Sequence, residues 1–241
     1  MKIKQFIIEE GYKEGISMNP PELEKILDDY HSNTIDASQF YRKASVTTDN
    51  GTCLYDFIKF REIKATEWIL EKISDNHHQN DDKILDLGCG TGFESTYLAE
   101  TKAKNGTVFC LDKSKGMLEI AKKRAIKRNL NNLQFIQGNT KPLPFKDNEF
   151  STVLCINSLF MPSELGYYRD AEIAYRYIIL HRLKEINKVI KPHGKLYFMF
   201  GYNKDESDDG IEHHCHLLKE TGFSCIKDTS VFSNPENIHS N

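Results

Sequence analysis

The chain has 241 residues, of which 39% are hydrophobic and 11% aromatic, and its formal net charge is -3. These values suit one globular domain with an appendage, and they exclude global disorder and a broadly cationic surface for nucleic acid. No apolar run approaches the roughly 18 residues of a transmembrane helix, so no membrane partner is expected. Acids interrupt the N-terminal stretch MKIKQFIIEEGYKEG early, which argues against a signal peptide.

The cysteines are scattered along the chain and form no CxxC pair. Several of them fall within predicted strands or tight turns. We therefore expect buried, reduced thiols and a cytoplasmic protein. The cysteines are Cys53, Cys89, Cys110, Cys155, Cys215 and Cys225.

Residues 1–80 are expected to form a helical N-terminal cap that ends in a linker. The stretch NPPELEKILDDYH predicts a helix with Asn19 as its cap and prolines in its first turn. A loop rich in Ser, Thr, Asp and Asn follows, and apolar residues at helical spacing predict a second helix over about 55–74. The polar stretch SDNHHQNDD (74–82) is interpreted as the linker.

Residues 81–241 alternate between strand and helix patterns. This alternation is typical of an α/β fold with a doubly wound, mostly parallel sheet. Ser114 is the expected cap of one helix, and Gly222 is expected to end another with a positive φ. The expected strands are 83–87, 107–112, 133–137, 151–156, 195–200 and 223–231, and the expected helices are 93–104, 114–129, 171–190 and 208–221. The polar, proline-containing last residues leave open whether a final strand completes the sheet.

The stretch KILDLGCGTGF (83–93) runs a strand into three glycines spaced two apart, behind an acid. Ligands of such sheets bind at the carboxyl ends of the strands, and glycine allows positive φ and a close approach of the backbone. A dinucleotide fingerprint G-x-G-x-x-G requires a glycine where Phe93 stands. Asp86 would also repel a pyrophosphate, whereas it can hold an ammonium group. A NAD(P)-linked oxidoreductase is therefore disfavoured.

The pattern D-x-G-x-G-x-G resembles the first motif of the class I S-adenosylmethionine-dependent methyltransferases. The resemblance continues in chain order through TVFCLDKSKGML, LQFIQGNTKPLPFKDNEFSTVLCINS, LKEINKVIKPHGKLYFMFG and LLKETGFSCIKD, and covers residues 83 to about 230. It implies a Rossmann-like methyltransferase fold in residues 81–241 and S-adenosylmethionine as the cofactor.

The resemblance also implies a cofactor site at the strand ends. Asp86 would support the amino group of the cofactor, Asp112 would accept hydrogen bonds from the ribose hydroxyls, and Asn157 would face the methyl donor. The residues that follow the second and third strands would lie near the adenine. The expected cofactor-binding residues are Asp86, Gly88, Cys89, Gly90, Gly92, Asp112, Lys113, Asn139, Thr140 and Asn157.

Two positions depart from the family pattern. Asn139 stands where the family often has Asp, and its amide oxygen can still accept a hydrogen bond from the adenine amino group. His193 stands in a turn where glycine is usual, which the fold tolerates if His193 has a negative φ.

The chemistry implied by the resemblance is in-line transfer of a methyl group that the sulfonium already activates, so alignment is the main task of the protein. The sequence identifies no catalytic base. Asn157 and Ser158 occupy the place of the acids that metal-dependent members need, and HHCH (213–216) lacks a matching set of ligands. No metal site is therefore predicted.

The cap and the insertion 159–177 are where members of this fold bind substrate, and they favour a small-molecule acceptor. The candidate substrate-binding residues are Tyr41, Tyr55, Tyr167 and Tyr168. A protein or RNA methyltransferase is an alternative, supported only by the basic stretch KKRAIKR (122–128); a nucleic-acid partner is not favoured. A non-catalytic module that binds S-adenosylmethionine is the other alternative, and the sequence does not give the oligomeric state.

Overall fold

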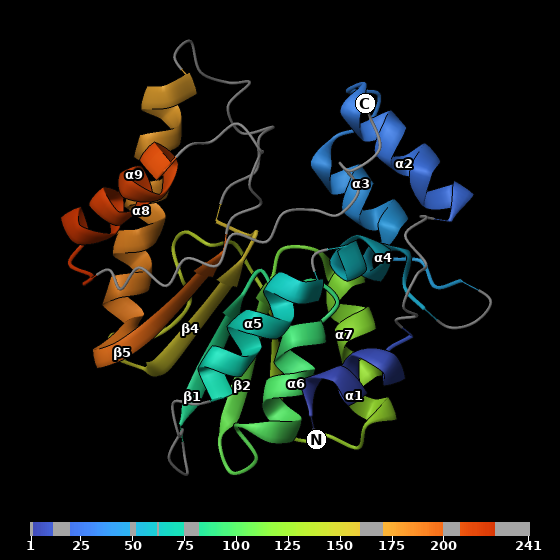
Figure 1. Ribbon diagram of the computed structural model, residues 1–241, viewed down its shortest axis with the longest axis horizontal. Coiled ribbons are helices and arrows are strands. Elements are labelled where there is room, and N and C mark those ends of the chain that lie inside the picture. Colours follow the sequence, from blue (N-terminus) through green and yellow to red (C-terminus); the bar gives the residue numbers. More distant parts are fainter. Residues whose placement is uncertain are drawn as a thin grey trace.

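A computed structural model describes residues 2–11, 20–48, 52–61, 63–74, 82–159, 171–199 and 208–224. At its centre lies a five-stranded parallel sheet in the order β3-β2-β1-β4-β5, with helices on both faces (Figure 1). The chain builds β1 to β3 outward on one side and then returns to place β4 beside β1. The strand order therefore reverses between β1 and β4, which is where such sheets bind ligands. The expected doubly wound α/β fold is confirmed.

Strands β1 to β4 lie close to where the sequence predicts them, whereas β5 begins at Ile190 and not at the expected residue 195. Their bounds are β1 Lys83–Leu87, β2 Thr107–Asp112, β3 Leu133–Gln137, β4 Phe150–Ile156 and β5 Ile190–Met199. The central strand β1 pairs with both β2 and β4. Because β1 is covered on both faces, its apolar residues Ile84, Leu85 and Leu87 are buried on either side of the sheet. Phe223 and Ser224 lie outside any strand, and the rest of the predicted strand 223–231 lies outside the described residues.

The helices form two layers around the sheet and a group beyond the strand ends. The bounds are α1 Ile3–Glu9, α2 Pro21–His31, α3 Ala37–Ala44, α4 Leu54–Arg61, α5 Ile63–Ser74, α6 Phe93–Thr101, α7 Lys115–Lys127, α8 Ala171–Val189 and α9 Asp208–Glu220. Helices α1, α5, α6 and α7 lie on one face and α8 and α9 on the other (Figure 1). Helices α2, α3 and α4 lie toward the carboxyl ends of the strands.

Each face of the sheet has its own hydrophobic core. Ile84 of β1 and Val108 of β2 point to the face where Phe93 of α6 and Phe6 of α1 are buried. Leu85 and its alternate neighbours point to the opposite face, where they meet α8 and α9. This period of two along the strands is what a sheet covered on both faces requires. Helix α1 thus belongs to the core of the sheet, although it stands at the start of the chain.

Two helices in the N-terminal region were missed by the sequence analysis. Helix α1 is only seven residues long. Helix α3 begins with a capping box, in which Asp36 Oδ1 accepts from the Gln39 amide at 2.8 Å and Gln39 Oε1 accepts from the Asp36 amide at 2.9 Å. The cap position of α2 is Pro20 and not the expected Asn19, so of the two prolines only Pro21 stands in the first turn as predicted. The caps Ser114 and Gly222 are confirmed, with Gly222 at φ 92°.

Two further expectations are wrong. His193 has φ 63° and not a negative φ, because the chain turns within β5 where that strand also shifts register against β4. Cys215 is disulfide-bonded, whereas Cys53, Cys89, Cys110 and Cys155 are free and buried. The spacing of cysteines gave no sign of this bond, because disulfide partners meet in space and not in sequence. Among the described helices, none has the length and apolar character that crossing a membrane requires, and the cytoplasmic location stays a prediction.

Candidate functional site

The loop after β1 is held in a shape that requires glycine. Gly88, Gly90 and Gly92 have φ of 76°, 53° and 70°. A Cβ on Gly88 would lie 2.2 Å from Cβ of Ser158, and a Cβ on Gly92 would lie 2.7 Å from Cβ of Ala121. At Gly90 the nearest atom is the Tyr55 ring carbon Cε1 at 3.6 Å. The two outer glycines therefore permit close packing, and Gly90 faces a more open space.

Four backbone amides of this loop donate hydrogen bonds within the protein. Gly88 and Cys89 donate to the carbonyl of Leu111 at 2.8 and 3.1 Å, and Gly92 donates to Cys89 at 2.9 Å. Gly90 donates to Asp112 Oδ2 at 2.9 Å. A phosphate-binding loop presents free amides to its anion. Gly88–Gly92 is therefore poorly suited to a pyrophosphate, in agreement with the glycine spacing.

Asp112 ends β2 directly opposite the loop. Its Oδ1 accepts from the Ser114 amide at 2.7 Å, and its Oδ2 accepts from Gly90. Each carboxylate oxygen has a second lone pair, so Asp112 can also accept from a ligand. Burial raises the pKa of Asp112 above its ordinary value, while the two amides and Lys113 act in the opposite direction. The carboxylate thus fixes the loop and remains able to bind hydroxyl groups.

Asp86 lies beneath the loop and is 3% exposed. Its Oδ2 accepts a hydrogen bond from the hydroxyl of Ser95 on α6. Burial, followed by the neighbouring charge of Glu94, raises the pKa of Asp86 to about 7. Cys89 is also buried, and burial raises the pKa of its thiol well above the ordinary value, so the thiol is neutral and not a nucleophile.

Two of the predicted substrate-binding tyrosines lie against the loop. The ring of Tyr55 approaches Gly90, and the rings of Tyr41 and Tyr55 have centroids 5.8 Å apart. The ammonium of Lys113 lies 5.9 Å from the centre of the Tyr41 ring. The structure therefore brings Tyr41, Tyr55 and Lys113 together beside Asp112. Tyr167 and Tyr168 lie outside the described residues.

The remaining predicted residues follow neighbouring strands. Asn139, which is exposed, and Thr140 come just after β3, whose last residue pairs with Asp112 in register. Asn157 comes just after β4, has φ 50°, and donates its amide to the Met199 carbonyl at 2.9 Å. These positions surround the same strand ends as the loop (Figure 1).

The sequence analysis missed four largely buried charged residues beside the loop. Thr91 donates its hydroxyl to Asp56 at 2.5 Å, and its carbonyl accepts from Arg124. Lys59 on α4 donates to Glu94 on α6 at 2.6 Å. Polar residues in a predicted helix ordinarily face solvent, so their spacing gave no sign of burial.

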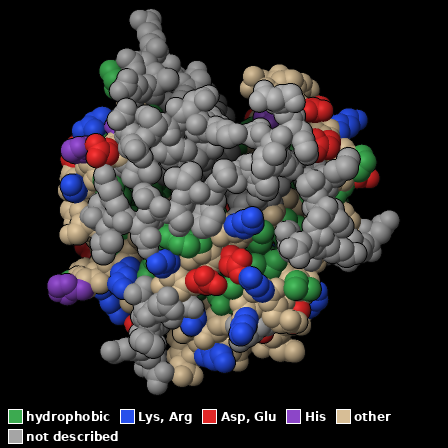
Figure 2. All heavy atoms as spheres, in the orientation of Figure 1, with side chains coloured by type: hydrophobic (Ala, Val, Ile, Leu, Met, Phe, Trp, Pro, Cys, Tyr) green, Lys and Arg blue, Asp and Glu red, His purple; other side chains and the backbone are tan. Residues whose placement is uncertain are grey.

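The two arginines of the basic stretch 122–128 form ion pairs inside the protein, whereas its three lysines are exposed. Arg124 donates to Glu10 at 2.6 Å, and Arg128 donates to Glu10 at 2.6 Å and to Glu100 at 2.8 Å. The guanidinium of Arg128 also lies 4.3 Å from the Phe6 ring centre. On the described part of the face in Figure 2, basic and acidic side chains lie next to one another. The arginines of this stretch thus hold α1 in place, and its exposed basic side chains are Lys122, Lys123 and Lys127.

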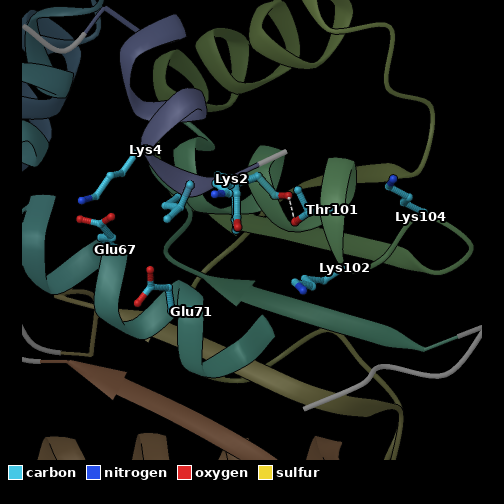
Figure 3. Close-up of a pocket in the computed structure, with 9 residues that line it drawn as sticks. Lys2, Lys4, Glu67, Glu71, Thr101, Lys102 and Lys104 are labelled. Atoms are coloured by element: carbon cyan, nitrogen blue, oxygen red, sulfur yellow. Dashed lines mark hydrogen bonds between the residues drawn. The ribbon is translucent and has the colours of Figure 1, made fainter. Parts of the chain in front are cut away.

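A cavity of about 540 Å³ lies elsewhere, between α1, α5 and the end of α6 (Figure 3). Lysines and glutamates line it, among them Lys4, Glu67 and Glu71. Thr101, at the last turn of α6, donates to the Tyr97 carbonyl at 2.6 Å (Figure 3). Because the glycine loop precedes α6, this cavity is at the opposite end of the helix and is not part of the site described above. Among the described residues, no cluster of side chains suits a metal ion.

A family model described as a methyltransferase domain matches residues 78–236. The chain belongs to this methyltransferase domain family. The resemblance to class I S-adenosylmethionine-dependent methyltransferases is therefore confirmed. The demethylmenaquinone methyltransferase of Lactococcus lactis subsp. lactis is 38% identical over 113 residues, which are 47% of this chain and 39% of that protein. The chain spans about half the length of other curated relatives with the same name.

Solved structures support the fold of this methyltransferase domain. A protein of Methanococcus maripaludis, provisionally described as an S-adenosyl-L-methionine-dependent methyltransferase, has a TM-score of 0.51 at 24% identity, covering 69% of this chain and 83% of that one. The [4+2]-cyclase SpnF has a TM-score of 0.51 at 22% identity, covering 66% of this chain and 57% of that one. Since one of these proteins is named a cyclase, likeness of fold alone does not give the reaction.

Proposed function

We propose that this chain transfers a methyl group from S-adenosylmethionine to a small-molecule acceptor. The observation that carries the proposal is the loop Gly88–Gly92, with its amides turned inward and with Asp86 and Asp112 on either side of it at the switch point of the sheet. Membership in the methyltransferase domain family supports the cofactor, and relatives named demethylmenaquinone methyltransferase support a small-molecule acceptor.

The residues present fit S-adenosylmethionine. Asp112 would accept hydrogen bonds from the ribose hydroxyls through its remaining lone pairs. Lys113, Asn139 and Thr140 would lie along the adenine, because they follow β2 and β3 next to Asp112. The open side of Gly90 would receive the methionine part, with Tyr55 covering it.

When bound, the sulfonium supplies a methyl group that is already activated. The chain would align the methyl group with the acceptor, because the loop and Asp112 would fix the two ends of S-adenosylmethionine. A near-attack distance of about 3 Å between acceptor and methyl carbon can contribute several kcal/mol. Asn157, at the end of β4, would face the acceptor side, and Tyr41 and Tyr55 would exclude water from the other side. Within the predicted cap 1–80, helices α2, α3 and α4 would cover this site, because α1 and α5 pack on a face of the sheet.

Calorimetric titration with S-adenosylmethionine, S-adenosylhomocysteine and NAD tests the cofactor. We expect the two sulfur compounds to bind in the micromolar range and NAD not to bind. Binding of NAD without the sulfur compounds would refute the proposal.

Transfer of a labelled methyl group into a metabolite pool tests the acceptor. Label in protein or RNA alone would overturn the small-molecule acceptor, and binding without any transfer would identify a non-catalytic module.

A further inference from the structure

Two buried carboxylates, Asp86 of β1 and Glu94 of α6, interact electrostatically near the glycine loop. Glu94 is in the first turn of α6, directly after the glycine loop, and is 1% exposed. The negative charge of Glu94 raises the pKa of Asp86 of β1, which is 3% exposed. The ammonium of Lys59 on α4 lies 2.6 Å from Glu94 Oε1 and also lowers the pKa of Asp86 and Asp112. Lys59 is therefore placed among the acids that surround the loop.

The second carboxylate oxygen of Glu94 accepts no hydrogen bond. Oε2 is buried, and none of the described residues donates to it. A buried carboxylate oxygen without a donor is unfavourable, because it has lost its water and gained no partner. Oε2 is thus an acceptor, next to the glycine loop, that a ligand can satisfy.

The surrounding charges favour a cationic donor. A hydroxyl group would satisfy Oε2 but would leave the repulsion between Glu94 and Asp86. An ammonium group supplies N–H donors and also a positive charge, and such charge-assisted bonds are the stronger ones. A metal ion fits less well, because no set of metal-ligating side chains gathers among the described residues.

We propose that Glu94 accepts the α-ammonium group of S-adenosylmethionine through Oε2, while Oε1 keeps Lys59. This inference rests on the proposed function, since it names the residue that binds one end of that cofactor. It changes the role of Asp86, which holds the Ser95 hydroxyl and adds negative charge beneath the loop without being the main contact of the ammonium.

The variant Glu94→Gln tests this assignment. Its side-chain oxygen can still accept from Lys59, but an amide NH₂ replaces Oε2 and repels an ammonium group. Calorimetry at about pH 8, where Asp86 is mostly ionised, compares three probes. These are S-adenosylhomocysteine, its analogue without the α-amino group, and 5′-methylthioadenosine, which lacks the amino-acid end. Glu100→Gln, which is partly exposed near the other end of the same helix and pairs with Arg128, is the matched control.

We expect Glu94→Gln to weaken S-adenosylhomocysteine binding at least about tenfold and to leave the other two probes within about twofold. Glu100→Gln should change none of them. Equal weakening of all three probes, or of none, overturns the assignment of Glu94. If the variant does not fold, the affinities of the unaltered protein are compared instead. Equal affinity of that protein for S-adenosylhomocysteine and for its deaminated analogue overturns the inference. An unaltered protein that binds none of the probes refutes the proposed function itself.

Discussion

Arg124 on α7 and Asp56 on α4 form an ion pair inside the protein, with side chains only 7% and 1% exposed. Arg124 also donates from Nε to Glu10 at 2.6 Å and to the Thr91 carbonyl in the glycine loop. Burial alone would lower the pKa of Arg124, but Asp56 and Glu10 raise it above its ordinary value. One guanidinium therefore joins the N-terminal helices α1 and α4 to the candidate cofactor site.

Replacing Arg124 by Met should destabilise the protein strongly. The change leaves Asp56 and Glu10 buried without their counter-charge, and breaking such a pair costs about 3–5 kcal/mol. Urea denaturation followed by circular dichroism measures the effect. Lys123→Met, on the exposed face of the same helix, is the control and should change stability by less than about 0.5 kcal/mol. A loss below about 1 kcal/mol for Arg124→Met would show that the ion pair is unimportant.

Replacing Asp112 by Asn should weaken binding of S-adenosylhomocysteine roughly 10- to 100-fold. The amide has one acceptor oxygen in place of two, so the new side chain cannot keep the Gly90 and Ser114 amides and also bind both ribose hydroxyls. Calorimetry measures the loss, with the exposed Asp147→Asn as control. An unchanged affinity would mean that the ribose binds elsewhere.

Alanine at Gly88 and at Gly90 should have different effects. At Gly88 the new Cβ meets Ser158 at 2.2 Å, so we expect a destabilisation of several kcal/mol by urea denaturation. At Gly90 the backbone strain costs about 1 kcal/mol, and the Cβ has room. Gly90→Ala should therefore fold but should obstruct the cofactor, which calorimetry would show as lost binding. Full binding by Gly90→Ala would place the cofactor away from this loop.

Asp86 should make stability fall as the pH rises from about 4 to about 7. Its folded-state pKa of about 7 is above the ordinary value, so the folded protein holds the proton more tightly than the unfolded chain. The resulting stabilisation is full below about pH 4 and is lost as the pH approaches about 7. A difference of about three pH units sets an upper limit of about 4 kcal/mol.

The variant Asp86→Asn isolates this effect. Asn can still accept from Ser95 but does not ionise, so it should be more stable than the unaltered protein at about pH 8 and should lose that advantage at about pH 4. Urea denaturation of both proteins across this range gives the difference. A constant difference would show that Asp86 does not titrate there.

The sheet could be predicted because its strands carry short, mainly apolar segments that alternate with helical patterns, such as TVFCLD in β2 and FSTVLCI in β4. Asp112 and the glycines could be predicted to meet, since the carboxyl ends of neighbouring parallel strands share one edge. The capping box Asp36–Gln39 is a local sequence pattern from which the start of α3 could also have been predicted.

Other features depend on contacts between residues far apart in the sequence, so no pattern in the neighbouring residues predicts them. Helix α1 is too short to show a periodicity, and it is stable because Phe6 packs on Phe93 and Arg128 while Glu10 pairs with both arginines. The same holds for Lys59 and Glu94, which are 35 positions apart in the sequence. Charged residues on helices are usually solvated, so only the structure reveals the buried ones.

The attachment of α1 to α7 limits how this protein can be shortened. A version trimmed to residues 78–236, where the family model matches, would lack Glu10 and Asp56, so Arg124 would lose both carboxylates and Phe93 would lose the cover of Phe6. Such a fragment would expose an apolar and positively charged surface and would be prone to aggregate. The matched region of this chain is therefore not expected to fold stably alone, and the folding unit extends back to helix α1.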